Sequence, residues 1–198
     1  GYSTVQIGDQ CWFAENLRTT TYLNGDAIPQ NLSVWEWSST TSGAMAIYND
    51  DLMAQTASGG LYNWYAVDDA RGLCPSGWHV PTDGEWMTME LALGMDEVNA
   101  NSTDWRGTDQ GTQMKTTYGW GGGGNGTNSS GFSGLPGGSR FNDGLFSNAG
   151  DVGFWWSSSP DGSLEAWFRY LIDGQNEVGR SSYFRSNGYS VRCVRDAE

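Results

Sequence analysis

The segment Val80-Pro81-Thr82-Asp83-Gly84-Glu85-Trp86 contains the clearest helix start in this chain. Thr82 or Asp83 can serve as the N-cap, and Glu85 lies where a capping box from Thr82 places its partner. Apolar side chains then recur at helical spacing until a glycine that can end the helix. The sequence therefore predicts a helix over residues 82–93.

The C-terminal part of the chain shows strand patterns. Runs rich in aromatic and β-branched residues, separated by Asp-Gly and Asn-Gly turns, predict strands over residues 154–158, 166–172, 177–180 and 190–195. Residues 4–14 alternate loosely around Gly8-Asp9 and predict a hairpin. Residues 61–67 are too short a run for periodicity to separate helix from strand. This mixture of strands and short helices predicts the α+β class.

The composition indicates a folded protein with an aromatic core. Leu, Val, Phe and Ile supply only 32 of 198 residues, about 16%, which is below the roughly 20% at which a highly charged chain is suspected of disorder. The 11 Trp and 9 Tyr compensate, since each ring buries on the order of 150–250 Å². The 29 Gly favour turns, and residues 99–151 predict a long glycine-rich loop. No linker divides the chain, so we expect one domain over residues 1–198.

The charge excludes one class of partner. The chain has 23 acidic and 10 basic side chains, a formal charge of −13, and no basic run. We therefore expect no binding to nucleic acid, which requires a positive surface. Residues 1–99 hold 13 acids and 2 bases, whereas residues 100–198 hold 10 acids and 8 bases, so the second half is nearly neutral. No apolar run reaches the ~18 residues of a membrane span, so we expect no membrane insertion of this domain.

Six ordered blocks of the sequence resemble one bacterial family. They are Gln10-Cys11-Trp12-Phe13-Ala14-Glu15-Asn16-Leu17, Gly60-Leu61-Tyr62-Asn63-Trp64, Cys74-Pro75-Ser76-Gly77-Trp78-His79-Val80-Pro81-Thr82, residues 131–140, residues 154–158 and residues 188–196. Together they are similar to the Fibrobacter-type major paralogous domain over nearly the whole chain. The resemblance implies a C-type-lectin-like fold with long Gly-rich loops and few short helices, in a module of a larger exported protein.

Two further groups share that fold. Residues 80–86 are similar to a block of the formylglycine-generating enzyme group, and residues 188–192 are similar to its terminal strand. Variable proteins of diversity-generating retroelements use the same fold and display their variable residues on the final strands and loops. The resemblance thus implies a scaffold that supports catalysis in some proteins and binding in others. Whether this chain carries the reactive residues of an enzyme distinguishes the two functions.

The three cysteines allow three pairings on the sequence alone, and their spacing matches no zinc site. The resemblance implies a Cys74–Cys193 disulfide, with Cys11 unpaired and buried behind Trp12. Such a disulfide implies an oxidising compartment, so we expect an extracellular or cell-surface location.

The inventory of reactive residues argues against an enzyme. A hydrolase triad needs a histidine base, and the only histidine, His79, occupies a position that predicts a packed structural role. Formylglycine-generating enzymes need a reactive cysteine pair in the C-terminal half, which here holds only Cys193. We therefore expect no catalytic residues. An enzyme or accessory protein of polysaccharide or sulfate metabolism stays open as an alternative, because 23 acids make some glycosidase-like pair inevitable.

Calcium is a possible cofactor without an assigned site. The acidic pairs Asp50-Asp51, Asp68-Asp69 and Asp96-Glu97 gather hard oxygen ligands, which calcium prefers. None of them matches an EF-hand loop or the Glu-Pro-Asn motif of calcium-dependent lectins. A solvated acidic face is the alternative interpretation.

The last strands carry the candidate binding surface. Alternation along residues 166–172 puts Trp167 and Arg169 on one face and Phe168 and Tyr170 on the other. If the second face is buried, the first faces outward. Rings beside Arg and Asn suit stacking on sugars or anchoring a protein partner. With the adjoining turns, the candidate ligand-binding residues are Trp167, Arg169, Asp173, Asn176, Arg180, Tyr183 and Arg185.

These observations predict a non-catalytic ligand-binding or adhesion module at the bacterial cell surface. Its expected partner is a glycan or a surface protein, bound through the C-terminal strands and loops. The alternative is a diversified protein-binding domain of the retroelement type, with substitutions concentrated in residues 154–190.

Overall fold

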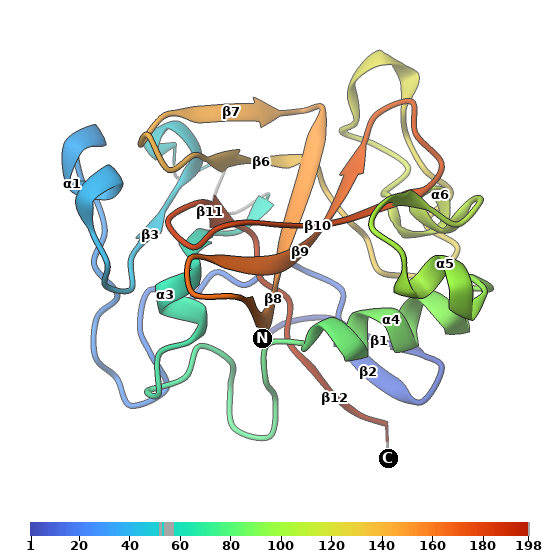
Figure 1. Cartoon of the computed structure of the whole chain (residues 1–198), viewed down its shortest axis with the longest axis horizontal. Helices are drawn as coiled ribbons and strands as arrows, with labels where there is room; N and C mark the ends of the chain where they lie inside the picture. The colour runs from blue at the N-terminus through green and yellow to red at the C-terminus, as the bar shows by residue number, and fades with distance from the viewer. Residues whose placement is uncertain (52, 54–57, 198) are drawn as a thin grey trace.

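The structure is a computed structural model that describes residues 1–51, 53 and 58–197. It combines two β-sheets with short helices, so the expected α+β class is confirmed (Figure 1).

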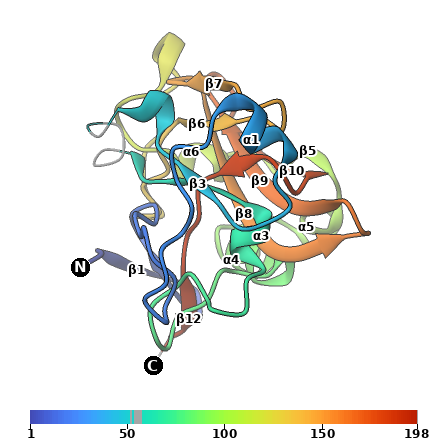
Figure 2. The same ribbon diagram turned by 90° about the vertical axis from the view of Figure 1, so that its left-hand side faces the viewer.

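The small sheet pairs the two ends of the chain. It is antiparallel, in the order β1-β2-β12, with bounds β1 (Thr4–Ile7), β2 (Gln10–Phe13) and β12 (Val194–Asp196). The predicted hairpin turns at Gly8, whose φ of +59° is a conformation that glycine adopts readily. Figure 2 places both termini with β1 and β12 at one end of the molecule.

The large sheet has nine strands among the described residues. Its order is β3-β4-β11-β6-β8-β9-β10-β5, with β7 also paired to β6, and only β6 and β8 are parallel. The bounds are β3 (Met45–Ala46), β4 (Leu61–Asn63), β5 (Asp104–Arg106), β6 (Gly137–Arg140), β7 (Phe146–Ala149), β8 (Val152–Asp161), β9 (Glu165–Ile172), β10 (Val178–Phe184) and β11 (Gly188–Tyr189).

The predicted helix over 82–93 is confirmed as α4 (Asp83–Ala92). Thr82 is its N-cap, and the capping box with Glu85 is present in both directions. Gly94, with φ +95°, follows the end of the helix. The other helices whose bounds lie within the described residues are α1 (Val34–Ser39), η1 (Tyr48–Asp50), α3 (Trp64–Val67), α5 (Glu97–Asn101), α6 (Gln110–Met114) and η2 (Gly121–Gly123).

Three segments differ from expectation or refine it. Residues 61–67 form a strand followed by a helix, because β4 ends at Asn63 and α3 begins at the next residue. The Asn63 side chain caps α3 by accepting from the Ala66 amide. The predicted strand over 190–195 is broken, since the chain leaves the large sheet after β11 and joins the small sheet only at Val194. The glycine-rich region 99–151 is not one long loop, because it also contributes β5, α6, β6 and β7.

Strands β8, β9 and β10 separate two cores. On one side Trp155 and Leu171 pack with Trp86 of α4. On the other side Trp156 and Phe168 pack in a second buried cluster. Large aromatic side chains dominate the interior, as the composition predicts; the fully buried tryptophans are Trp12, Trp37, Trp64, Trp86, Trp155 and Trp156.

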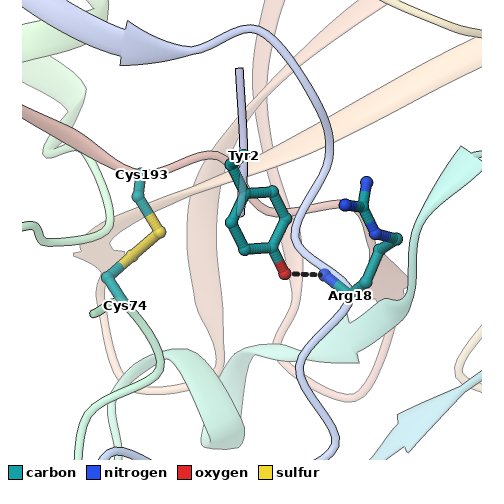
Figure 3. The surroundings of a disulfide bond; sticks show 4 residues. All are labelled: Tyr2, Arg18, Cys74 and Cys193. Atoms are coloured by element: carbon teal, nitrogen blue, oxygen red, sulfur yellow. Dashed lines mark hydrogen bonds between the residues drawn. A yellow bond between two sulfur atoms is a disulfide. The ribbon is translucent and has the colours of Figure 1, made fainter. Parts of the chain in front are cut away.

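The Cys74–Cys193 disulfide implied by the resemblance is present, with Cα atoms 5.9 Å apart across 119 residues of sequence. Figure 3 shows it near the hydrogen bond in which the Arg18 amide donates to the Tyr2 hydroxyl. Disulfides of this kind form in oxidising compartments outside the cytoplasm. Cys11 is unpaired but only half-buried, so its expected burial is wrong. No helix of the described part of the chain is long and apolar enough to cross a membrane.

Candidate functional site

The two faces of β9 have different surroundings. We define the helix face as the side of Trp167, Arg169 and Leu171, which packs toward α4, and the ring face as the side of Phe168 and Tyr170. The predicted alternation is confirmed. The predicted exposure is wrong for Arg169, because this side chain is fully buried against α4.

Arg169 belongs to an ionic network on the helix face. It donates to Glu90 Oε1 at 2.7 Å and to Asp83 Oδ1 at 2.6 Å. Arg180 donates to both Asp83 oxygens, at 3.1 and 2.7 Å, and Arg106 donates to both Glu90 oxygens at 2.8 Å. These planar, bidentate pairs fix α4 against the sheet. Arg169 and Arg180, predicted as ligand-binding, are therefore occupied by the protein's own carboxylates.

The network favours the ionised form of Asp83. Burial alone would raise the pKa of Asp83, but the hydrogen bond from Arg180 and the charge of Arg169 outweigh it and lower that pKa. Burial also lowers the pKa of Arg106, against the effect of Glu90. The arginines therefore stabilise the charged form of Asp83, which in turn holds Arg169 and Arg180 in place.

Trp167 marks the solvent edge of the helix face. Its half-buried ring lies under the Arg180 guanidinium, whose central carbon is 4.0 Å from the ring centroid. The structure thus brings these two predicted residues into contact. The arginine is held by α4, and only the tryptophan presents surface to solvent.

A row of half-buried rings crosses the other side of the sheet. Trp105 of β5 and Tyr170 of β9 both pair with Gly179 of β10, and Phe154 of β8 pairs with Tyr170. The rings of Trp105 and Tyr170 meet edge to face at 4.6 Å, and those of Phe154 and Tyr170 stack at 6.4 Å. A Cβ at Gly179 would lie 2.2 Å from the Tyr170 ring, so only glycine leaves room for it. Three strands thus supply the rings of one aromatic row, which passes over Gly179 of β10.

Two side chains extend this row along β10. Ser181 and Tyr183 lie two and four residues beyond Gly179 on the same face, a distance of about 13 Å. Tyr183 is 42% exposed. Burial, with the nearby charge of Asp104, raises the pKa of Tyr170, so its hydroxyl stays protonated at neutral pH. We call the set Trp105, Phe154, Tyr170, Ser181 and Tyr183 the aromatic surface.

The remaining predicted residues lie elsewhere. Arg185 stacks on Trp64, with its guanidinium carbon 4.2 Å from the ring centroid, and donates to the carbonyls of Glu165 and Gly162. Asn176 accepts a hydrogen bond from the Thr112 hydroxyl in the turn between β9 and β10, and Asp173 lies in the same turn beside the glycine-rich segment 121–124. The seven predicted residues therefore do not form one site.

Of the aromatic surface the sequence predicted only Tyr183; the residues it missed are Trp105, Phe154, Tyr170 and Ser181. Trp105 lies within the region predicted as a loop, and it joins the site only because β5 pairs with β10 far along the chain. Phe154 lies in a predicted strand, and it is half-buried at the edge of the core. The small residue Gly179 in a predicted strand was the available signal, since glycine in a strand often marks a close approach.

The acidic pairs are used locally. Asp69 is paired with Arg71, and Asp96 caps α5 by accepting from the Asn99 amide. Within residues 1–51, 53 and 58–197, no three His, Cys, Asp or Glu side chains are grouped to hold a metal ion. His79 is half-exposed rather than packed, and it hydrogen-bonds Glu85 of the capping box at 2.6 Å.

A comparison with protein-family models finds one match. The model described as Fibrobacter succinogenes major domain matches residues 5–195, nearly the whole chain. No curated protein and no solved structure matches this chain.

Proposed function

This chain belongs to the Fibrobacter succinogenes major domain family, and from that premise we propose that it is a non-catalytic module that binds a glycan or protein ligand outside the cytoplasm. We place the binding site on the aromatic surface. The proposal treats residues 1–198 as one domain of an extracellular or surface-attached protein. The disulfide between Cys74 and Cys193 supports this location.

We further propose a C-type-lectin-like fold. Three features support it: the two ends of the chain pair in one small sheet, α4 packs on the large sheet, and long glycine-rich segments connect short elements. Such a scaffold holds its surface rigid and presents side chains from strands and loops. A preorganised surface loses little conformational entropy when a ligand binds.

The aromatic surface is the observation that carries the proposal. Trp105, Tyr170 and Phe154 come from strands in one sheet, so the row spans about 14 Å across four neighbouring strands. Ring faces and edges offer apolar area for sugar rings or for apolar side chains of a protein. The protonated Tyr170 hydroxyl and the hydroxyls of Ser181 and Tyr183 add hydrogen-bonding groups that orient a ligand.

The chemistry of this surface supports binding rather than turnover. Its members are aromatic rings and hydroxyls, and none of them is an acid or base near neutral pH. The charged groups on the opposite face of β9 are buried in pairs. Recognition is therefore the activity that these residues support best.

The proposal is tested with a glycan and surface-protein array, probed with and without calcium, to obtain a ligand. Trp105→Ala and Tyr170→Ala are then expected to weaken binding of that ligand at least tenfold, as removal of a central aromatic anchor does. Trp167→Ala is the matched control, because it removes a half-buried ring from the helix face of the same sheet.

Each outcome of this test decides the proposal. Loss of binding in Trp105→Ala and Tyr170→Ala, with Trp167→Ala unchanged, supports the aromatic surface. Loss only in Trp167→Ala places the site on the helix-face edge and overturns our assignment. Turnover of an array glycan that a single carboxylate-to-amide change abolishes would show an enzyme instead. Loss of binding without calcium would add a metal to the proposed mechanism.

A further inference from the structure

A second site candidate lies where three of the family-like blocks meet. A cavity of about 250 Å³ is lined by Glu15, Asn16 and Arg18 at the end of the first block, by Ser133 of the block 131–140, and by Tyr118. The last block, residues 188–196, contributes Arg192, which donates hydrogen bonds to the Asn16 side chain and to the Ser133 carbonyl. The cavity shares no residue with the aromatic surface.

Arg192 is a buried charge without a carboxylate partner. Its side chain is fully buried, and its guanidinium donates to Asn16 Oδ1 at 2.7 Å and to the carbonyls of Phe13, Phe132 and Ser133. In the part of the chain that the structure describes, no acidic side chain hydrogen-bonds it. Burial lowers the pKa of Arg192 to about 9, so it remains charged at neutral pH. Buried charges are normally paired. Arg140 and Lys115 are also buried against carbonyl acceptors, but Arg192 is the one of the three whose exposure is 0%.

The side chain of Asn16 lies between Arg192 and the cavity, and hydrogen bonds hold it in place. Asn16 accepts from Arg192 and from the Trp155 indole at 2.8 Å, and its amide nitrogen donates to Ser58 and Ser190. Asn16 therefore has a fixed orientation beside the cavity. The charge of Arg192 lies one residue behind the lining.

The local charge is positive although the protein is strongly acidic. Arg18 and Arg192 stand against Glu15, which pairs with Arg18 and accepts from the Ser3 amide at 2.7 Å. The Ser3 amide, together with Arg18, lowers the pKa of Glu15 to about 2, so the sum of these three groups is one positive charge. Other carboxylates act weakly here, since exposed charges are screened beyond about 8–10 Å at physiological salt.

From this geometry we infer that the cavity binds an anionic group of a small organic ligand, a carboxylate or sulfate carried by a sugar. Arg18 and the Tyr118 hydroxyl would donate to the anion, and Arg192 would stabilise it from behind Asn16. An anion there would supply the countercharge that Arg192 lacks within the protein. The cavity volume suits a single sugar ring.

Titration of the whole chain with glucuronate, glucose and inorganic sulfate, followed by calorimetry and thermal shift, tests this inference. Glucuronate or sulfate is expected to bind and raise the melting temperature, whereas neutral glucose is not. Binding of glucuronate alone identifies a sugar carboxylate, and binding of sulfate identifies the sulfate form. Equal effects of glucose and glucuronate, or no effect of either anion at 50 mM, would overturn the inference.

Two substitutions in the cavity are expected to change the affinity for the anion in opposite directions. Arg18→Gln is expected to raise the Kd of the bound anion about tenfold, since it removes a charge-assisted donor. Glu15→Gln is expected to lower it, because it removes the negative group of the lining. The reverse pattern would indicate a cation site and refute the proposal.

Arg71→Gln is the matched control for overall charge. Arg71 is also a partly exposed arginine paired with acids, Asp26 and Asp69, but it lines a different cavity. It is expected to leave the Kd unchanged; a tenfold increase here as well would show a non-specific charge effect and overturn the inference. All three variants are expected to retain binding to the ligand of the aromatic surface, so failure of one proposal is distinguishable from failure of the other.

Discussion

The two faces of β9 are one residue apart in sequence and differ in almost every physical property. On the helix face, Arg169 is fully buried in an ionic network with α4. On the ring face, Tyr170 is half-buried in a row of rings that contains no charge. The comparison teaches that on β9 charge is used for internal attachment, whereas the uncharged rings supply the available surface.

The physical reason is desolvation. An ionic group buried on the sheet needs polar partners, and for Arg169 these are carboxylates, because an unpaired buried charge is very costly. Once Asp83 and Glu90 satisfy these arginines, they have little capacity left for a ligand. A half-buried ring keeps apolar area that water solvates poorly, and this area is what a ligand can cover.

The largest effect is expected from Arg169→Ala. The substitution leaves Glu90 and Asp83 buried with fewer partners, and breaking such a buried pair costs about 3–5 kcal/mol. Urea unfolding measures this change in the free energy of unfolding. Arg185→Ala is the control, because Arg185 is half-buried and bonds only carbonyls. A loss below 1 kcal/mol for Arg169→Ala would mean that the helix face is not held by its charges.

A smaller effect is expected from Gly179→Ala on the ring face. The new methyl group overlaps the Tyr170 ring and should destabilise the protein by about 1–3 kcal/mol, as overpacking does. It should also displace the aromatic row and weaken ligand binding. Adding Tyr170→Ala removes the clash. The double variant should therefore lose less free energy of unfolding than the sum of the losses in the two single variants. If the two losses in free energy of unfolding simply add, the Tyr170 ring does not depend on a glycine at position 179.

A smaller difference between the two faces is expected in how stability depends on pH. The lowered pKa of Asp83 means that the unfolded chain binds its proton at higher pH than the folded chain does. Its contribution to stability is therefore complete above the ordinary carboxyl pKa of about 4 and is lost as the pH falls through the folded pKa. Thermal unfolding between pH 7 and 2 should show a flatter pH dependence for Asp83→Asn than for the wild-type chain. Tyr170→Phe should keep the wild-type slope, and equal slopes in all three would contradict this account.

The smallest change in stability is expected from Tyr183→Ala. This side chain is 42% exposed at the end of β10, and surface substitutions of this kind change the free energy of unfolding by at most about 0.5 kcal/mol. Its effect on affinity for the ligand of the aromatic surface should be larger than its effect on stability. Calorimetric binding compared with urea unfolding checks this, and the reverse order would make Tyr183 a structural residue.

Local features of the fold were predictable from the sequence. The α4 helix with its Thr82 cap, the hairpin at Gly8 and the strands around residues 154–158 and 166–172 all follow from short-range patterns. The resemblance also implied the correct disulfide. These features depend on neighbours within a few residues or on a motif, and both are visible in a linear sequence.

The candidate site was only partly predictable. Alternation correctly separated Trp167 from Phe168, but it could not show which face is covered, because α4 supplies the covering acids from 79 to 86 residues away. Nor could it place Trp105, which reaches the row by pairing across β10. Long-range pairing therefore decided which residues are available to a ligand.

The sequence by itself determined an aromatic-rich α+β chain with an acidic first half, because composition, caps and alternation are local properties. Only the tertiary structure decided which charged side chains are buried and which groups they pair with. It paired arginines of the nearly neutral second half with acids of α4, since a buried carboxylate is strongly destabilising unless a cation or several donors pair with it. It left Arg192 without a carboxylate partner among the described residues and the ring row without cover, and these two departures locate both proposed sites.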